Sequence, residues 1–371
     1  MLTAVMAVVG VIYTLIAAAL TARFIARRSH AAVSFPAVSI IKPLHGAPDG
    51  LARALERFCD QDYPGPIQIV FGVHDAGDPA VQVVERLRAE RPGIDIALVI
   101  DPQLHGANRK ASNLANIAAR ASHEVLVLSD ADILVEPDYL RRVTAALHGP
   151  GVGAVSCLYV GLSSRNLWSR LSAMGIDYQF LPSVVLGKSI GMAQPCFGST
   201  IAMTRAVLAE IGGFEAVAHH LADDYEIGRA VRARGYSIAI PAMTVAHHCT
   251  ETDRSSLIDH ELRWARTVRQ IDPAGYAGSI ITYPVPLALV AAALSGFAPW
   301  SAALIVATWL ARLSLKVCVD SVSGARAGPW WLVPARDCLS FGVFLASFAV
   351  NTVGWQGRRF RVGPGGLILQ S

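Results

Sequence analysis

Charged residues are scarce in this sequence, and three long stretches contain none. They make up 16% of the 371 residues, against 53% that are hydrophobic, and the mean hydropathy is +0.42. The uncharged stretches are 1–22, 273–311 and 338–357. Because about 20 apolar residues are enough to span a bilayer, they predict one amino-terminal transmembrane helix and about three near the carboxyl end. Residues 1–22 lack the basic start of a signal peptide, so we expect a retained anchor.

Other absences argue against further classes of protein. The six cysteines include no CxxC pair, which argues against a zinc site or a disulfide framework and agrees with a reducing compartment. The net charge is +4, but no basic run is dense enough to indicate a nucleic-acid partner. A GxGxxG fingerprint is missing after the first predicted strand, which disfavours a dinucleotide-binding fold. The pairs His219-His220 and His247-His248 lack a third ligand at zinc spacing, so we do not place them in a site.

Arginines beside the uncharged stretches predict the orientation in a membrane. The arginines at 23–28 follow the first stretch, so the positive-inside rule places the next domain in the cytoplasm. Three carboxyl-terminal spans would then put the carboxyl end outside, whereas the arginines at 358–361 favour the inside. Two explanations stay open, a re-entrant segment near Pro284 and Pro286 or an overridden charge bias.

The middle of the chain, residues 35–272, alternates short apolar runs with helical patterns. Strands that alternate with helices form βαβ units and a parallel sheet. We therefore expect an α/β domain with its ligand site at the carboxyl ends of the strands. The aromatic segment 167–190 is expected to be an amphipathic, membrane-facing piece rather than a span. The runs that predict the strands are 37–41, 67–73, 94–100, 125–128, 152–160, 197–203, 237–240 and 243–246.

Two acidic residues follow the buried-strand pattern of Val125–Leu128. Asp130 and Asp132 are two positions apart, so they point to one face if the chain is extended and take separate partners if it already turns. Their hard oxygens suit a divalent cation, Mg2+ or Mn2+, bound together with substrate phosphates. The simpler alternative is a strand-end turn with capping carboxylates. Asp75 ends another predicted strand and should reach the same edge.

Two later helices carry further candidates. Asp223 and Asp224 open one predicted helix, where acids often only complement the helix dipole. That explanation suits Asp223 but is less persuasive for the pair. The other helix places His260, Arg263 and Trp264 on one face through their i, i+3 and i+4 spacing. The simpler alternative for it is a basic helix on the lipid surface.

The order of these motifs resembles the membrane-bound glycosyltransferases of the GT-A fold, in the ceramide glucosyltransferase-like branch and, within it, the bacterial hopanoid-biosynthesis subgroup. The matching segments cover nearly the whole chain in order, which makes the resemblance stronger than any one motif. They are Lys42–Leu44, Asp60–Pro64, Val73–Asp75, Asp78–Ala80, Asn108–Lys110, Ser129–Ile133, Leu221–Tyr225, His260–Trp264 and Trp355–Phe360.

The resemblance implies a role for each candidate. Asp75 would contact the uracil or ribose, Asp130 the nucleotide and sugar, and Asp132 the metal. Lys110 would neutralise diphosphate charge. Asp224 matches the general base that accepts the proton of the acceptor hydroxyl, so attack opposite the leaving UDP would invert the anomeric centre.

The same resemblance leaves one position open. His260 stands where the family has Gln or Arg, so it would contact diphosphate either as a charged donor or through a neutral imidazole. Arg263 would bind phosphate or the catalytic carboxylate, and Trp264 would form part of the acceptor wall.

Taken together, the resemblance implies an inverting hexosyltransferase that moves a sugar from a UDP-sugar to the hydroxyl of a membrane lipid. A hopanoid with UDP-N-acetylglucosamine is favoured over ceramide with UDP-glucose. A processive polysaccharide synthase would need a translocation channel, for which the predicted helices are few, and a transporter or scaffold would need a polar pathway that is not evident.

The expected place of the protein is the inner membrane of a bacterium, with the catalytic domain in the cytoplasm. The expected domains are an anchor at 1–25, a GT-A-type nucleotide-diphospho-sugar transferase domain at 35–272, a membrane region with about three helices at 273–357 and a basic tail at 358–371.

Overall fold

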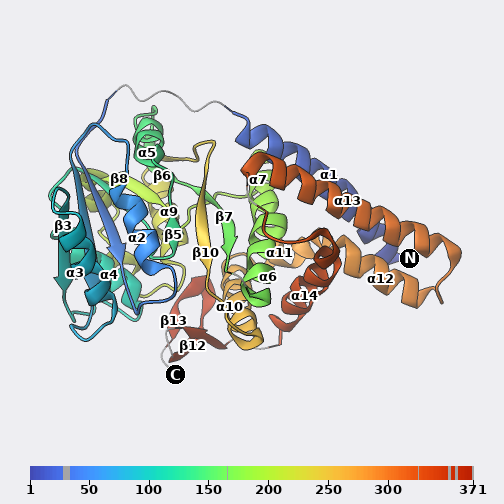
Figure 1. Ribbon diagram of the computed structural model, residues 1–371. Helices are drawn as coiled ribbons and strands as arrows, with labels where there is room; N and C mark the ends of the chain where they lie inside the picture. Colours follow the sequence, from blue (N-terminus) through green and yellow to red (C-terminus); the bar gives the residue numbers. More distant parts are fainter. Residues whose placement is uncertain (28–33, 165, 325, 350–351, 356–357, 370–371) are drawn as a thin grey trace. The chain divides into compact units, whose positions relative to one another are not determined.

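The chain of the computed structural model divides into two compact units (Figure 1). The sheet unit comprises Arg28–Tyr159 and Gln194–His248, and the helical unit comprises Met1–Arg27, Val160–Ala193 and Cys249–Ser371. The predicted cytoplasmic domain, 35–272, therefore contributes residues to both. The structure describes residues 1–27, 34–164, 166–324, 326–349, 352–355 and 358–369.

A seven-stranded sheet of order β3-β2-β1-β4-β8-β6-β9 forms the sheet unit's core. β1 pairs in parallel with β2 and β4, so the carboxyl ends that lead to Asp75 and Asp130 lie at the same edge, as predicted. β8 pairs antiparallel with both β4 and β6. The strands are β1 (Val38–Pro43), β2 (Ile67–Val73), β3 (Asp95–Ile100), β4 (Val125–Leu128), β6 (Val152–Ser156), β8 (Ile201–Thr204) and β9 (Ser237–Ala239).

The sheet is therefore mixed, and the expectation of a parallel sheet is wrong for β8. The chain leaves this unit after Tyr159 and returns at Gln194, so β8 is not reached through a helical crossover of the βαβ type. The run 152–160, predicted as one strand, forms two, β6 and then β7 (Leu158–Ser163), which carries the chain into the helical unit.

Helices of the sheet unit bury their apolar faces against the sheet. Leu114 and Ile117 of α4 join Ile41, Val70 and Leu126 in one buried cluster. α4 begins at a defined point because the Asn108 side chain accepts a hydrogen bond from the Ala111 amide (3.0 Å). The helices are α2 (Leu51–Cys59), α3 (Ala80–Glu90), α4 (Arg109–Ala118), α5 (Tyr139–Leu147), α8 (Arg205–Glu210), the 3-10 helix η2 (Glu215–Val217) and α9 (Asp223–Ala233).

A short antiparallel pair extends the loop after β4. β5 (Ile133–Leu134) pairs with β10 (Thr244–Cys249), with Ile133 opposite His247 and Leu134 opposite Ala246. Because Ile133 follows Asp132 directly, this register brings His247 to the acidic residues.

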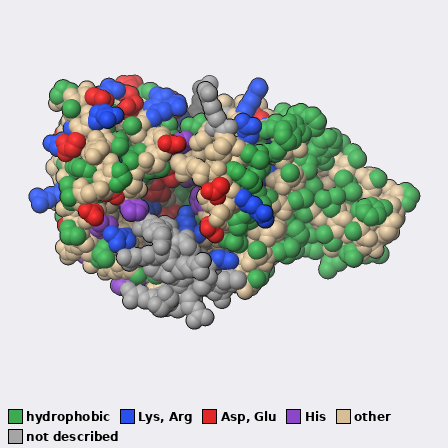
Figure 2. All heavy atoms as spheres, turned by 60° about the horizontal axis from the view of Figure 1, so that its bottom comes forward, with side chains coloured by type: hydrophobic (Ala, Val, Ile, Leu, Met, Phe, Trp, Pro, Cys, Tyr) green, Lys and Arg blue, Asp and Glu red, His purple; other side chains and the backbone are tan. Residues whose placement is uncertain are grey.

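The helical unit contains two described helices that are long and apolar enough to cross a membrane, α1 (Leu2–Ile25) and α13 (Pro299–Ser323). The hydrophobic side chains that cover this part of the chain dominate one end of Figure 2. The predicted amino-terminal helix is confirmed. The prediction of about three carboxyl-terminal spans is too high, because only α13 qualifies there as a single described helix.

The ends of the uncharged runs do not coincide with the ends of the helices. Arg312 of α13 donates two hydrogen bonds to Asp337 (2.8 and 2.7 Å) and one to the Tyr178 carbonyl (2.8 Å), and Lys316 pairs with Asp320. Both cations are buried with these partners, and the helix continues past the end of the uncharged run at Ala311. α14 (Val333–Ala346) has only 14 residues, about 21 Å at 1.5 Å per residue, which is shorter than the hydrocarbon core.

The remaining candidate is a bent pair of helices. The segment Pro273–Thr282 and the helix α12 (Pro284–Leu294) meet at 71°, so they form either one broken span or a re-entrant loop. This bend lies near Pro284, where a re-entrant segment is one of the two explanations left open by the sequence. Gly10 of α1 packs against it, and a Cβ there would lie 2.6 Å from the Ile281 carbonyl oxygen and 3.0 Å from the Pro284 Cβ.

Helices and short strands complete the helical unit. The amphipathic segment predicted at 167–190 forms two helices joined by one π-helical turn, whose Asp177 accepts a hydrogen bond from the Gly161 amide (2.7 Å). Gln356, Gly357 and the last two residues of the predicted basic tail lie outside the described residues. The elements are α6 (Leu167–Gly175), η1 (Ile176–Phe180), α7 (Leu181–Ser189), α10 (Arg254–Ile271), α11 (Pro273–Gly278), η3 (Ser279–Thr282), η4 (Trp330–Leu332), β11 (Thr352–Trp355), β12 (Arg358–Val362), η5 (Pro364–Gly366) and β13 (Ile368–Leu369).

The close approach at Gly10 predicts opposite effects for two Gly→Ala substitutions. Gly10→Ala should lower the free energy of unfolding by about 1–3 kcal/mol, because the methyl group overpacks the contact with Ile281 and Pro284. Gly342→Ala, on α14 with open space around it, should leave stability unchanged or raise it by up to about 1 kcal/mol. Thermal unfolding of the detergent-solubilised chain measures both, and equal effects would contradict the packing.

Candidate functional site

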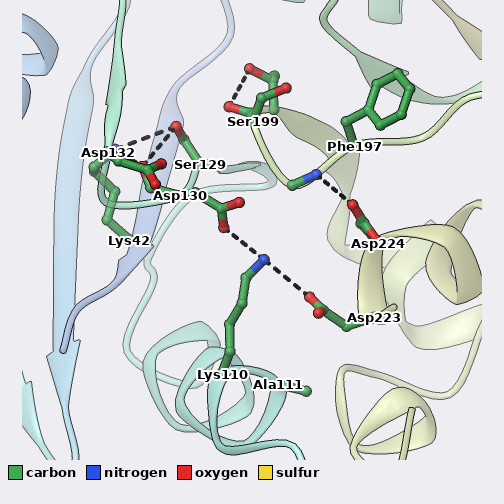
Figure 3. Close-up of polar contacts among 12 residues, drawn as sticks. Lys42, Lys110, Ala111, Ser129, Asp130, Asp132, Phe197, Ser199, Asp223 and Asp224 are labelled. Atoms are coloured by element: carbon green, nitrogen blue, oxygen red, sulfur yellow. Dashed lines mark hydrogen bonds and ion pairs between the residues drawn. The ribbon is translucent and has the colours of Figure 1, made fainter. Parts of the chain in front are cut away.

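An acidic loop, Ser129–Asp132, follows β4 at the carboxyl edge of the sheet (Figure 3). The Ser129 amide donates to the Ile41 carbonyl (3.2 Å), which continues the β1–β4 pairing by one residue. The Asp130 amide then donates to the Gly198 carbonyl (3.0 Å), and the Ile133 amide to the Asp130 carbonyl (3.4 Å). The chain therefore turns at Asp130, which sends Asp130 and Asp132 to separate partners.

Lys110 joins the acidic loop to the start of α9. Its Nζ lies 2.6 Å from Asp130 Oδ1 and 3.3 Å from Asp223 Oδ2, and Figure 3 shows the ammonium between the two carboxylates. The second position of α4 holds it there, because Asn108 fixes where that helix begins. Lys110 thus pairs with two carboxylates, and its contact with a diphosphate stays a prediction.

Asp223, the second carboxylate beside Lys110, is itself held in place by Asn108. Its side chain is only 6% exposed, and Oδ1 accepts a hydrogen bond from Asn108 Nδ2 (3.3 Å). Asn108 Nδ2 also donates to the His220 carbonyl (2.7 Å). Asp223 is therefore more than a complement to the helix dipole, since it ties the start of α9 to the start of α4.

Asp224 lies beside this ion pair and is held by main-chain groups. Its Oδ2 accepts a hydrogen bond from the Gly198 amide (3.1 Å), and its Oδ1 accepts one from the Tyr225 amide (2.8 Å). Gly198 thus accepts from Asp130 and donates to Asp224. A Cβ on Gly198 would lie 2.6 Å from Asp130 Oδ2 and 2.7 Å from Lys110 Nζ, so a side chain here would displace this ion pair.

The charges of the cluster shift its proton affinities. Burial, followed by the neighbouring charge of Asp223, raises the pKa of Asp224 to about 6, while Lys110 pulls it down. Burial lowers the pKa of Lys110, but Asp130, Asp223 and Asp224 outweigh it, so this pKa is raised above its usual value. Near neutral pH, Lys110 is a permanent cation, and Asp224 is close to its titration range.

Asp132 is directed away from Lys110, toward β10. Its Oδ2 lies 3.2 Å from His247 Nε2, and its carbonyl accepts the His248 amide (2.8 Å). Two ligands at right angles around a cation with bonds of about 2.1 Å are about 3.0 Å apart, so this carboxylate and imidazole fit one divalent ion. Among the described residues no three His, Cys, Asp or Glu form a metal cluster. The remaining ligands would then be phosphate oxygens and water.

Asp75 follows β2 at the same edge and is exposed. Its Oδ1 accepts a hydrogen bond from the Gly77 amide (2.9 Å), which orders the turn after the strand. The preceding His74 points inward, and its two ring nitrogens lie 3.0 Å from the Asp101 carbonyl and 2.8 Å from the Arg109 carbonyl. His74 therefore connects the end of β2 to the start of α4, one residue before Lys110.

His260, Arg263 and Trp264 lie on α10 in the helical unit. His260 Nδ1 is 2.5 Å from Oε1 of the buried Glu251, and the His260 and Trp264 rings meet edge to face at 4.6 Å. Burial opposes ionisation of Glu251, but the contact with His260 prevails and lowers its pKa. The helix begins at a capping box formed by Asp253.

Sequence reasoning gave no role in the site to three residues that the structure places beside the acidic loop. Gly198 belongs to no motif that spacing could reveal. His247 was left out because it lacked a third ligand at zinc spacing, and only the β5–β10 register brings it to Asp132. Lys42 lies beneath the loop with its Nζ 2.8 Å from the Asp130 carbonyl. Its place at the end of an apolar strand pattern was the available signal.

The fold and the acidic edge together define the class of protein. The mannosyltransferase PcManGT from Pyrobaculum calidifontis, solved with GDP-Man and Mn2+, matches 93% of this chain and 99% of its own with a TM-score of 0.54 at 20% sequence identity. The chain therefore has a GT-A-like glycosyltransferase fold built on a mixed α/β sheet.

The model of Glycosyl transferase family 21 matches residues 2–368. The chain belongs to this family, which confirms the predicted ceramide glucosyltransferase-like branch and the enzyme class.

Curated relatives match the chain at low identity. Ceramide glucosyltransferase 1 of Caenorhabditis elegans is 24% identical over 234 residues, which are 63% of this chain and 50% of the relative. An N-acetylglucosaminyltransferase of Bradyrhizobium diazoefficiens is 26% identical over 249 residues, 64% of this chain and 50% of the relative. The chain thus spans about half the length of the curated relatives it matches.

Gly198→Ala should lower glycosyltransferase activity at least tenfold, because the methyl group displaces the Lys110–Asp130 pair and the main-chain contact to Asp224. The matched control is Gly93→Ala, at a turn with open space around the glycine. Initial rates with each variant, read alongside thermal unfolding, measure the effect. Full activity of Gly198→Ala would contradict the described geometry.

Proposed function

We propose that this protein is an inverting glycosyltransferase that moves a sugar from a UDP-sugar to the hydroxyl of a membrane lipid. The observation that carries the proposal is the Asp224 carboxylate held beside the Lys110–Asp130 pair at the carboxyl edge of a GT-A-like sheet. The two apolar helices support a lipid acceptor, because they would tether the chain to the membrane in which such a molecule is dissolved.

A hopanoid is the acceptor we favour, with UDP-N-acetylglucosamine as donor. The motif order supports the hopanoid, and the likeness to a bacterial N-acetylglucosaminyltransferase supports the donor. Ceramide with UDP-glucose is the second candidate, which the likeness to ceramide glucosyltransferases favours. We place the protein in the inner membrane of a bacterium as a multi-pass protein with its catalytic domain in the cytoplasm.

Asp224 is the proposed general base. Its deprotonated carboxylate would accept the proton of the lipid hydroxyl as that oxygen attacks the anomeric carbon. The bond from this carbon to the diphosphate oxygen breaks on the opposite face, so UDP leaves with the bonding electrons and the configuration inverts. Lys110 would keep Asp224 ionised, and Asp223 would hold Lys110 in place.

Asp75 and Asp130 are proposed to hold the uridine and the sugar, and Asp132 with His247 is proposed to hold a divalent cation. That cation, Mg2+ or Mn2+, would neutralise the charge that develops on the departing diphosphate. His260 and Arg263 are proposed contacts for the diphosphate. Glu251 supports this role for His260, because its hydrogen bond orients the imidazole. The proposed lipid contact is Trp264.

The test is incubation of membranes that contain the full chain with labelled UDP-N-acetylglucosamine or UDP-glucose, followed by extraction of the lipid. Hopanoid and ceramide are supplied in separate arms. Asp224→Asn should lower transfer by roughly 10²–10⁴-fold while Mn2+–UDP binding persists, because it removes only the base. The exposed Asp95→Asn is the matched control. Normal turnover by Asp224→Asn would contradict its role as the general base. Lipid labelling that persists in EDTA would contradict the metal site.

The pH profile tests the same base independently. Because the pKa of Asp224 is raised to about 6 and the ionised form is the active one, transfer should rise with pH through about 6 and then level off. Asp223→Asn removes a neighbouring negative charge that raises this pKa, so the acid limb should move to lower pH. Initial rates of transfer at saturating donor, from about pH 4 to 9, measure the acid limb of this profile. An upward shift, or none, would contradict the proposed electrostatics.

A further inference from the structure

Lys42, the penultimate residue of β1, is fully buried at 0% exposure. Among the residues that the structure describes, no carboxylate lies within ion-pair distance of its Nζ. The ammonium instead donates to the Asp130 carbonyl (2.8 Å) and to Ser129 Oγ (3.3 Å). On its other side it lies 3.7 Å from the centre of the Phe58 ring. A methionine would fill this space without a charge to desolvate.

The burial of this charge is unfavourable by itself. Removing an ammonium from water costs several kcal/mol, and a carbonyl, a hydroxyl and an aromatic face compensate only in part. Burial accordingly lowers the pKa of Lys42 to about 7, against the opposing pull of Asp130 and Asp132. A lysine at such a position lowers stability relative to an apolar residue, so its presence indicates a task for the ammonium group.

The contacts of Lys42 indicate that task. Ile41 is paired with Leu128, so Lys42 is level with Ser129 where the acidic loop begins. The Asp130 carbonyl that it binds also accepts the Ile133 amide, and this hydrogen bond closes the turn that contains Asp132. Lys42 therefore holds the main-chain oxygen whose hydrogen bond with the Ile133 amide closes the turn.

We propose that Lys42 is a positioning residue for donor binding, which fixes the Asp130 carbonyl so that the acidic loop presents its two carboxylates to a metal–nucleotide diphosphate. Its complete burial excludes contact with the substrate, so it acts through the loop alone. The proposal rests on the proposed function, since it assumes that Asp130 and Asp132 bind the donor.

The test measures binding instead of turnover. Isothermal titration of the full chain in detergent with UDP in the presence of Mn2+ gives a Kd for the wild type, Lys42→Met and Lys42→Gln. Lys42→Met has almost the same volume but cannot donate, and Lys42→Gln is polar but uncharged and shorter. Both should raise the Kd at least tenfold. Lys42→Gln keeps the test decisive if Lys42→Met does not fold.

Two controls separate positioning from stability. Val84→Ala truncates a buried side chain of α3, which packs on α2, β2 and β3 rather than on the acidic loop. Lys188→Met makes the same chemical change at an exposed lysine. Both should bind Mn2+–UDP within twofold of the wild type. Thermal unfolding of every variant is recorded in parallel.

The outcomes are distinguishable. Tenfold weaker binding by the Lys42 variants, with the controls unchanged, supports the role. Wild-type affinity in the Lys42 variants overturns it and leaves the proposed function standing. A loss of binding in Val84→Ala that matches its loss of stability overturns it too, because the effect is then general. If the wild type does not bind Mn2+–UDP, the donor site fails, and the role of Lys42 falls with it.

Discussion

The arrangement of the site depends on one ammonium group, Lys110, placed among three carboxylates. Without it, Asp130, Asp223 and Asp224 would repel one another across a partly buried space, and fewer of them would stay ionised. The position of this ammonium is set by side-chain hydrogen bonds, because the Asn108 side chain caps the first turn of α4 and Asp223 ties that turn to α9. Gly198 completes the arrangement by linking the acidic loop to Asp224 through its backbone alone. The site is thus assembled from four separate segments of the chain: the start of α4, the acidic loop, Gly198 and the start of α9.

The two acids of the loop belong to different electrostatic surroundings. Asp130 is compensated by Lys110 and is fixed in position, whereas Asp132 lies against His247, a partner that also suits a metal. This separation follows from the turn at Asp130, which Lys42 and the Ile133 amide hold from the same carbonyl oxygen. A change in the backbone of one residue would therefore alter both halves of the proposed donor site.

Features that depend on the local sequence were predicted, whereas contacts that depend on how distant strands pair were not. Strand runs and the acids after them were recognisable, because alternation and strand-end carboxylates are local features. His247 was not, since its proximity to Asp132 comes from the β5–β10 register. The carboxyl-terminal spans were overcounted because an uncharged run does not have to form one long helix. Of these runs, 338–357 contributes to a helix of only 14 residues, and the start of 273–311 forms a bent pair. Lys42 was recognised as part of a motif, but its hydrogen bond to the Asp130 carbonyl could not be predicted, because every residue has a carbonyl group.

The central position of β8 has a consequence for how the chain folds during synthesis. β4 and β6 do not pair with each other. Each pairs with β8, which is synthesised about 45 residues after β6. Until then each presents an unpaired edge, a state that favours association between chains. Helix α1 precedes all of these strands in the chain and is long and apolar enough to cross a membrane, so it can hold the growing chain there while these edges are open. Tethering would keep nascent chains apart during the interval in which the sheet is incomplete.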